Sequence, residues 1–109
     1  MVKKKKIESI KKITQQVAEK YNPQKIILFG SFAYGKPAKD SDLDLLIVKQ
    51  VNKKKDLLER AYEVRQILDV HEALDILVFT PREIKERLKL NDLFIKDIFE
   101  KGKVLYERK

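Results

Sequence analysis

Three aspartates stand at positions from which they could bind a metal ion together. Asp42 and Asp44 open the apolar run 43–48, and Asp75 lies inside a second apolar run, 73–80. Alternate side chains of a strand point to the same face, so Asp42 and Asp44 would share a face, about 7 Å apart. Carboxylate oxygens are the ligands that Mg²⁺ prefers. The spacing predicts a divalent-metal site, although a single Asp-x-Asp also occurs as an ordinary turn cap.

Asp75 is flanked on both sides by apolar residues. Burying a carboxylate among such residues is costly unless charges or hydrogen bonds compensate. We therefore expect a strand-buried acid with a functional reason for its position. If its strand lies beside 43–48, Asp75 completes the site, and three carboxylates from two neighbouring strands suit a two-metal centre for phosphoryl transfer.

A glycine–serine turn precedes these carboxylates. Gly30 follows the apolar run 25–29 and would let the chain turn sharply, with backbone N–H groups free to approach a ligand. Ser31 could cap a short helix whose N-terminus favours a phosphate group. The same residues also fit an ordinary strand-to-helix turn, so the turn indicates an anion site only together with the carboxylates.

The elements that position these residues follow from hydrophobic periodicity and helix-boundary residues. The run Thr80-Pro81-Arg82-Glu83 is typical of a helix start with a capping box. The predicted order is helix 5–21, strand 25–29, turn 31–35, loop 36–41, strand 43–48, helix 56–70, strand 73–80, a helix from there to about 90, a helix from 91 or 92 to 102, and an edge strand 103–107. The last helix carries a stripe that indicates either core or a partner-facing surface, of which we favour the core: Phe94, Ile95, Ile98 and Phe99. This order predicts an α/β or α+β sheet with helices on at least one face, without fixing the strand order.

The composition fits a single domain over residues 1–109. A chain of 109 residues can bury one core, and the absence of cysteine excludes disulfides, thiolate zinc sites and cysteine nucleophiles. The net charge of +8 favours the approach of anionic substrates, although most of these charges are expected on a solvated surface. Neither a signal peptide nor an apolar run of about 20 residues is visible. We therefore expect a cytoplasmic protein without a membrane partner.

The joint spacing resembles the signature of the polymerase-β-like nucleotidyltransferase superfamily. In this chain the signature reads Gly30-Ser31, then Gly35, then Ser41-Asp42-Leu43-Asp44, with Asp75 on a later strand. The small size makes the chain most similar to the minimal nucleotidyltransferases, among them the MntA-type antitoxins. The resemblance implies an α+β fold (α/β sandwich-like), the palm of that superfamily, in which helices pack on a mixed β-sheet.

The resemblance also implies roles for individual residues. Asp42, Asp44 and Asp75 would hold two Mg²⁺ ions, and Asp75 would help to ready the attacking hydroxyl. Gly30, by its backbone, and Ser31, by its hydroxyl and N–H, would hold the β- and γ-phosphates of a nucleoside triphosphate such as ATP. The reaction would be an in-line attack on the α-phosphorus with release of pyrophosphate.

One position departs from the family pattern. Many relatives carry a basic residue where this chain has Tyr34. Lys36 and Lys39 in the following loop could supply that charge to the triphosphate, or could be solvated loop lysines. Tyr34 could stack on a base or simply pack.

The resemblance finally implies a partner. A palm of this size would depend on another protein, or on a homo-oligomer, to complete its acceptor site. In the family the usual partner is a HEPN-family toxin, a ribonuclease that is silenced when AMP is transferred from ATP to one of its tyrosines. Two rival hypotheses are transfer to a small molecule and a non-catalytic nucleotide-binding module, either regulatory or an antitoxin. Nucleic acid is not expected as the direct substrate, because no aromatic-basic recognition motif is present.

Overall fold

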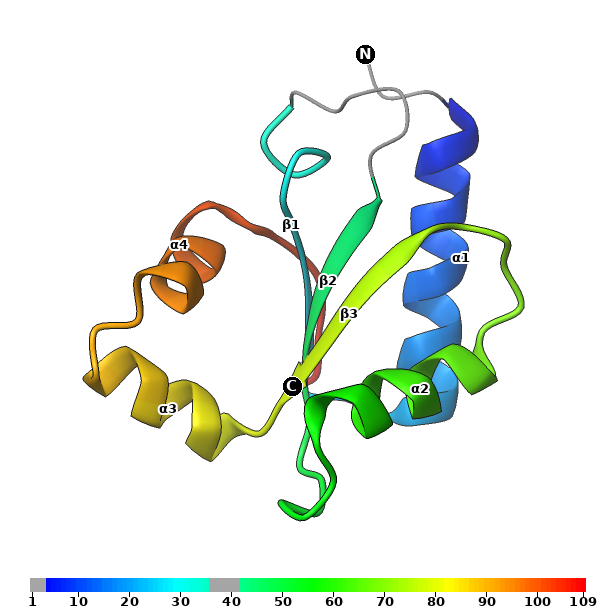
Figure 1. The fold of residues 1–109 in the computed structure, drawn as a ribbon. Coiled ribbons are helices and arrows are strands. Elements are labelled where there is room, and N and C mark those ends of the chain that lie inside the picture. The colour runs from blue at the N-terminus through cyan, green and yellow to red at the C-terminus, as the bar shows by residue number, and fades with distance from the viewer. Residues whose placement is uncertain (1–3, 36–41) are drawn as a thin grey trace.

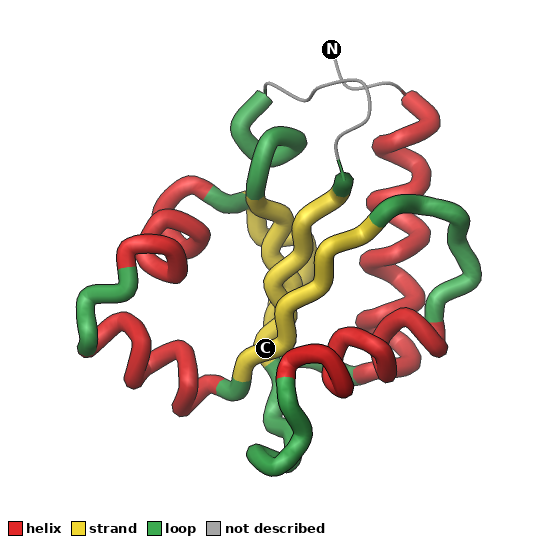
Figure 2. Tube along the Cα trace, viewed as in Figure 1, coloured by secondary structure: helices red, strands yellow, loops and turns green. Residues whose placement is uncertain are grey.

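The structure is a computed structural model that describes residues 4–35 and 42–109. A four-stranded sheet lies between two pairs of helices, with α1 and α2 on one side and α3 and α4 on the other (Figure 1 and Figure 2). In chain order the elements are α1 (Lys4–Tyr21), β1 (Lys25–Phe29), β2 (Leu43–Val48), α2 (Leu57–Ile67), β3 (Leu74–Phe79), α3 (Pro81–Lys89), α4 (Leu93–Lys101) and β4 (Lys103–Glu107). None of the helices in the described part of the chain combines the length and apolar character that crossing a membrane requires.

The sheet is mixed, as predicted. Its strands follow the order β3-β2-β1-β4, with β1 antiparallel to both of its neighbours and β2 parallel to β3. The parallel pair is joined through α2, because parallel neighbours need a long crossover connection. In this register Asp44 stands opposite Asp75. The two chain segments that carry the aspartates are therefore neighbouring strands.

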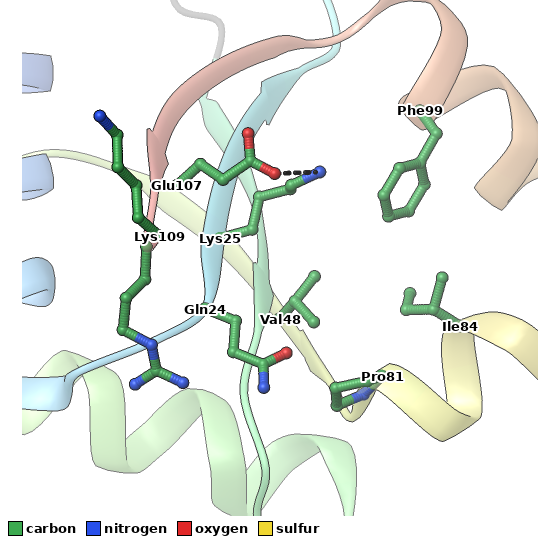
Figure 3. Close-up of a pocket in the computed structure, with 9 residues that line it drawn as sticks. Gln24, Lys25, Val48, Pro81, Ile84, Phe99, Glu107 and Lys109 are labelled. Carbon is green, nitrogen blue, oxygen red and sulfur yellow. Dashed lines mark ion pairs between the residues drawn. The ribbon is translucent and has the colours of Figure 1, made fainter.

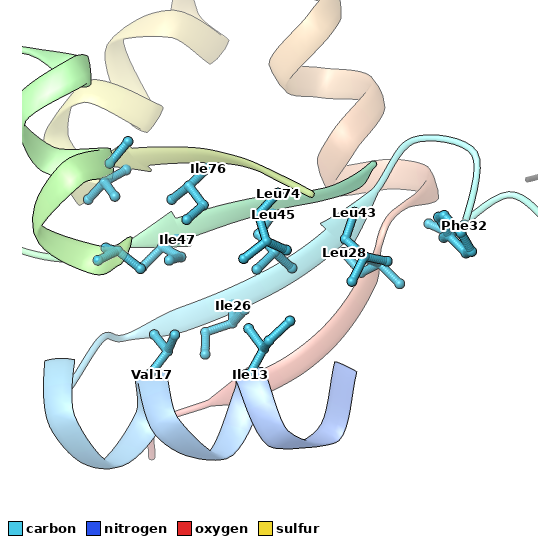
Figure 4. Packing of buried hydrophobic residues seen from close by; sticks show 14 residues of the cluster. Ile13, Val17, Ile26, Leu28, Phe32, Leu43, Leu45, Ile47, Leu74 and Ile76 are labelled. Carbon is cyan, nitrogen blue, oxygen red and sulfur yellow. The ribbon is translucent and has the colours of Figure 1, made fainter. Parts of the chain in front are cut away.

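Each side of the sheet has its own apolar core. Leu45 and Ile47 of β2 pack with α1 and α2 (Figure 4), whereas Leu46 and Val48 pack with α3 and α4. Successive strand residues face opposite sides of a sheet. Asp44 therefore shares the α3/α4 side with Leu46.

Capping side chains set the starts of three helices. Thr80 and Glu83 form the predicted capping box: the Thr80 hydroxyl accepts from the Glu83 N–H at 3.1 Å, and the Glu83 carboxylate accepts from the Thr80 N–H at 2.8 Å. Asp56 and Asp92 accept backbone N–H bonds at the starts of α2 and α4. Gly102 directly follows the end of α4, as predicted.

Two predicted boundaries are wrong. The helix 56–70 ends at Ile67, because the next residue, Leu68, already has an extended backbone with φ −90° and ψ 138°. The strand 73–80 is shorter by one residue at each end, since Thr80 serves as the cap of α3. Residues 31–35 form the predicted turn, and the alternative, a short helix that begins at Ser31, is not observed.

Two arginines of α2 contact the backbone of β3. Arg60 is only 2% exposed and donates to the Val78 carbonyl at 3.0 Å and to Oε1 of Glu83 at 2.7 Å. Arg65 donates to the Leu74 carbonyl at 2.7 Å. These bonds tie α2 to β3 and, through Glu83, to α3.

Candidate active site

The carboxylates of Asp44 and Asp75 lie side by side on the α3/α4 side of the sheet. They are register partners in the parallel pair β2–β3, and neighbouring strands are about 4.8 Å apart. Asp42 lies one residue ahead of β2, is exposed, and is close enough for its charge to act on Asp44. The structure therefore brings the three predicted aspartates to one end of the sheet.

The electrostatics of the cluster are visible in Asp44. Its pKa is raised from 3.8 to about 6, first by burial, then by the charge of Asp75 and a hydrogen bond with it, and further by the charge of Asp42. Each negative charge disfavours the ionisation of its neighbours. Asp44 therefore holds its proton to a higher pH than an ordinary aspartate, up to about pH 6, unless a cation takes the place of that proton.

This donor set fits a hard divalent cation. Mg²⁺ prefers carboxylate oxygens and keeps positions for water and phosphate, and it would offset the repulsion that raises the pKa of Asp44. Within residues 4–35 and 42–109, no three carboxylate, imidazole or thiol side chains are gathered closely enough to enclose an ion. In the described part of the chain, the three aspartates thus share one end of the sheet without closing around one position.

Gly30 brings the turn after β1 against Asp44. Its φ is +76°, a conformation that L residues rarely adopt, and a Cβ at position 30 would lie 2.0 Å from Oδ2 of Asp44. The Gly30 carbonyl accepts from the N–H groups of Ala33 and Tyr34 at 3.0 and 3.1 Å, which closes the turn. The backbone at Gly30 thus closely approaches a carboxylate of the cluster, while its approach to a ligand stays a prediction.

The rest of the predicted phosphate site is described in part. Ser31 is half-exposed and directly follows Gly30 in the turn. Lys36, which we expected to contact the triphosphate, lies outside the described residues, as do Lys39 and Ser41. The structural support for phosphate binding therefore rests on the turn at positions 30 and 31.

Asp75 is exposed, whereas the sequence predicts a buried acid. The core under α3 and α4 includes Leu77 and Phe79 of β3 but does not extend to the start of that strand. Because β3 is also an outer strand, the α3/α4 side of its start, where Asp75 lies, is open to water, whereas Leu74 and Ile76 are buried on the other side. The desolvation cost expected for this carboxylate is therefore largely avoided.

Phe94 is the second side chain that the sequence places wrongly. It was expected in the core, yet it is 54% exposed, while Ile95 and Ile98 are buried as predicted. Its ring meets the ring of Phe29 edge-on, with centroids 5.8 Å apart and an interplanar angle of 87°. Phe29 is in turn the register partner of Asp44. Phe94 lies in the first turn of α4, at the margin of the apolar stripe. That position is the signal that could have indicated incomplete burial.

A separate cavity of about 450 Å³ lies at the other end of the sheet (Figure 3). Lys25 and Val48, register partners at that end of β1 and β2, line it together with Ile84 and Phe99. Lys25 also pairs with Glu107 at 3.1 Å. The described residues that line this cavity include none of the three aspartates, so it is distinct from the carboxylate cluster.

Comparison with known proteins gives matches over nearly the whole chain. The family model described as "Polymerase beta, Nucleotidyltransferase" matches residues 8–109. A protein of Methanocaldococcus jannaschii, named as a candidate protein adenylyltransferase, is 31% identical over 101 residues, which are 91% of this chain and 96% of the relative. A candidate nucleotidyltransferase of Sulfolobus solfataricus, solved by crystallography at 1.40 Å, superposes with a TM-score of 0.62 at 25% identity, covering 98% of this chain and 91% of the other.

Proposed function

Because the chain belongs to the polymerase beta nucleotidyltransferase family, we propose that it is a Mg²⁺-dependent enzyme that transfers AMP from ATP to a tyrosine hydroxyl of a partner protein. The partner we propose is a HEPN-family toxin, which the modification silences, so that the chain acts as an antitoxin. The observation that carries the proposal is the position of the Gly30 turn directly against the Asp44–Asp75 pair.

The aspartates have different roles in this proposal. Asp42, Asp44 and Asp75 would hold Mg²⁺, which supplies positive charge to the phosphate oxygens when bound. Asp75 is exposed at the start of β3, where an incoming hydroxyl can reach it. The hydroxyl oxygen forms a bond to the α-phosphorus, and its proton passes to the Asp75 carboxylate. The bond between the α-phosphorus and the oxygen that bridges to the β-phosphorus breaks, which releases pyrophosphate.

The turn holds the phosphates that leave. The backbone at Gly30 carries no Cβ, so a phosphate chain can lie against it while the α-phosphate stays beside Asp44. The Ser31 hydroxyl and N–H would donate to the β- and γ-phosphates, and Lys36, which lies outside the described residues, would add positive charge. These interactions orient the triphosphate for in-line attack and contribute to the rate through positioning.

A protein acceptor is supported by two observations. The name of the M. jannaschii relative describes a protein adenylyltransferase, and that relative aligns over almost its full length. Asp42 and Asp75 are both exposed, so a bulky acceptor can reach the carboxylates. The choice of a HEPN-family tyrosine rests on the family resemblance.

The test is transfer of label from α-phosphate-labelled ATP, with Mg²⁺ and a purified HEPN-family toxin as acceptor. Label on a toxin tyrosine, with loss of its ribonuclease activity, is the expected result. Asp44→Asn and Asp75→Asn should each reduce the labelling on the order of 100-fold or more. Asp69→Asn is the matched control, because Asp69 is an exposed aspartate after α2, away from the cluster.

Three results would contradict the proposal. Label on a small molecule from a cell lysate, with none on the toxin, would establish the small-molecule rival. Equal neutralisation of the toxin by Asp44→Asn and by the wild type would establish a binding role without transfer. Neither label nor Mg-ATP binding would leave the family fold without the catalytic activity.

A further inference from the structure

Phe94 is a large apolar side chain that the fold leaves half open to water. It lies in the first turn of α4, where its N–H donates to the capping carboxylate of Asp92 at 3.0 Å. Ile95 and Ile98 anchor the same helix in the core with exposures of 0% and 1%, whereas Phe94 is 54% exposed. A firmly packed helix therefore presents a partly uncovered aromatic ring.

This ring lies close to the carboxylate cluster. Phe29 contacts Phe94 at a centroid distance of 5.8 Å, and Phe29 stands opposite Asp44 on the neighbouring strand. Ile27 and Phe29 belong to the core on the α3/α4 side, which is also the side of Asp44. With strands about 4.8 Å apart, the Phe94 ring is on the order of 10 Å from Asp44.

The glycine turn is linked to the same part of α4. The hydroxyl of Tyr34 in that turn is 3.5 Å from Oδ2 of Asp97, and Lys101 holds the other carboxylate oxygen at 3.1 Å. Asp97 follows Phe94 by three residues, and residues at that spacing share one face of a helix. The face of α4 that carries Phe94 is thus the face that meets the turn.

We propose that the base of the bound nucleotide stacks on the Phe94 ring, an inference that rests on the proposed nucleotidyl transfer. If the turn and the carboxylates hold the phosphates of ATP, the base extends away from them, beyond the ribose. Phe94 is an exposed ring on the order of 10 Å from Asp44 and on the same side of the sheet, which makes it a candidate to contact that base. Each base has a π-face, so stacking on an aromatic ring accepts any of them and contributes affinity without reading base identity. Phe94 is therefore a nucleotide-binding residue with weak base preference.

Two leucines provide matched controls. Leu90 follows the last residue of α3, Leu93 is the first residue of α4, and they are 83% and 70% exposed. They share with Phe94 an apolar character and an exposed position, but they have no aromatic ring. If exposure alone determined the effect, their substitution would change nucleotide binding as much as that of Phe94.

The experiment is calorimetric titration with Mg-ATP and with Mg²⁺ plus inorganic triphosphate, which carries the charges without a base. The variants are Phe94→Ala, Phe94→Tyr, Leu90→Ala and Leu93→Ala. We expect Phe94→Ala to bind ATP about 10-fold more weakly and triphosphate as the wild type does. Phe94→Tyr should keep the ATP affinity because it keeps the ring, and the leucine variants should match the wild type. Phe94→Leu serves in place of Phe94→Ala if circular dichroism shows that the alanine variant does not fold.

Other outcomes overturn the inference in distinguishable ways. An unchanged ATP affinity in Phe94→Ala rejects stacking, and if labelling of a protein acceptor falls at the same time, Phe94 contacts the acceptor. An equal loss for ATP and triphosphate shows that the substitution disturbs the phosphate site instead. If the wild type binds neither ligand, the proposed function fails, independently of Phe94.

Discussion

The backbone of Gly30 and the carboxylate of Asp44 occupy adjoining space, with no room for a side chain between them. A Cβ at position 30 would lie 2.0 Å from Oδ2 and 3.0 Å from Cγ of Asp44. Gly35, at the end of the same turn, has a similar φ of +80°, but a Cβ there would meet nothing within 4 Å. The two glycines share a backbone conformation and differ in their surroundings, so together they separate backbone strain from the contact with Asp44.

Gly30→Ala and Gly35→Ala should differ in activity far more than in backbone strain. Each substitution places a Cβ on a residue with positive φ and should lower the free energy of unfolding by about 1 kcal/mol. Only Gly30→Ala displaces the Asp44 carboxylate, so it alone should lose most of its nucleotidyl transfer. Urea unfolding and labelling from ATP measure the two effects. Equal activity in both variants would show that the position of Asp44 relative to the turn is unimportant.

The stability that Asp44 contributes to the metal-free protein should fall as pH rises from about 4 to about 6. The folded-state pKa of Asp44 is raised from 3.8 to about 6, so the folded protein binds this proton more tightly than the unfolded chain does. Stability is therefore lost with increasing pH across that window, and the loss is complete above it. In urea midpoints measured with a chelator, the wild-type value minus the Asp44→Asn value should fall across this window, and Asp69→Asn should behave as the wild type does.

The comparison with Asp44→Asn is needed because other carboxyls act in the opposite direction. Hydrogen bonds from Lys6 and Arg60 lower the pKa values of Glu72 and Glu83, so these groups add stability above their unfolded pKa and lose it in acid. The difference between wild type and Asp44→Asn removes these contributions. Saturating Mg²⁺ should reduce that difference, since the ion replaces the proton; a difference unchanged by Mg²⁺ would argue against metal binding at Asp44.

Arg60→Met should destabilise the protein by about 3 kcal/mol. Arg60 is 2% exposed and donates to Glu83 through both terminal nitrogens, at 2.7 and 3.2 Å. Its removal leaves the partly buried Glu83 carboxylate and the Val78 carbonyl without this donor. Arg82→Met is the control, because the Arg82–Glu86 pair is largely exposed and contributes about 0.5 kcal/mol or less. Similar urea midpoints for both variants would contradict a structural role for Arg60.

Gly102→Ala should lower the free energy of unfolding by about 2 kcal/mol, because it disturbs the contact between α4 and β1. Its φ of −68° is ordinary, so backbone strain is not the reason. A Cβ there would meet the Ile98 carbonyl at 2.5 Å and Cγ2 of Ile27 at 2.6 Å, which forces α4 away from the sheet. Because α4 carries Phe94, ATP affinity should fall as well. Lys103→Ala, at the exposed next position, is the control, and equal stability of the two variants would reject the steric explanation.

Most of the fold could be predicted from local signals. Thr80, Pro81 and Glu83 mark a helix start wherever they occur together, and Asn22-Pro23 marks the end of a helix, so the element order follows without tertiary information. The adjacency of Asp44 and Asp75 could not be derived from local pattern, because it depends on which strands pair. The family resemblance indicated that Asp75 belongs to the same site as Asp44, and the register of β2 and β3 shows that the two residues are partners.

Burial was predicted less well, for a physical reason. Asp75 and Phe94 lie at the margins of the core that α3 and α4 form with the sheet. Sequence periodicity identifies which face of an element is apolar, but it does not show where the packing on that face ends. Arg60 has the converse problem: an arginine in an amphipathic helix normally lies in water. Its burial depends on Glu83, which is far along the chain and positioned by its own helix cap.

The hydrogen bonds from Arg60 and Arg65 to β3 also affect which edge of the sheet can pair with a strand from another molecule. The Ala73 and Phe79 carbonyls accept from β2, so in the alternating pattern of a strand the Leu74 and Val78 carbonyls point outward, and these are the ones that the two arginines occupy. A strand from another molecule would have to displace both guanidinium groups before pairing there. Edge-to-edge pairing with another molecule, and aggregation that begins with such pairing, should therefore occur at β4, the opposite edge of the sheet, and not at β3. The end of β3 that carries Asp75 then stays accessible to substrates.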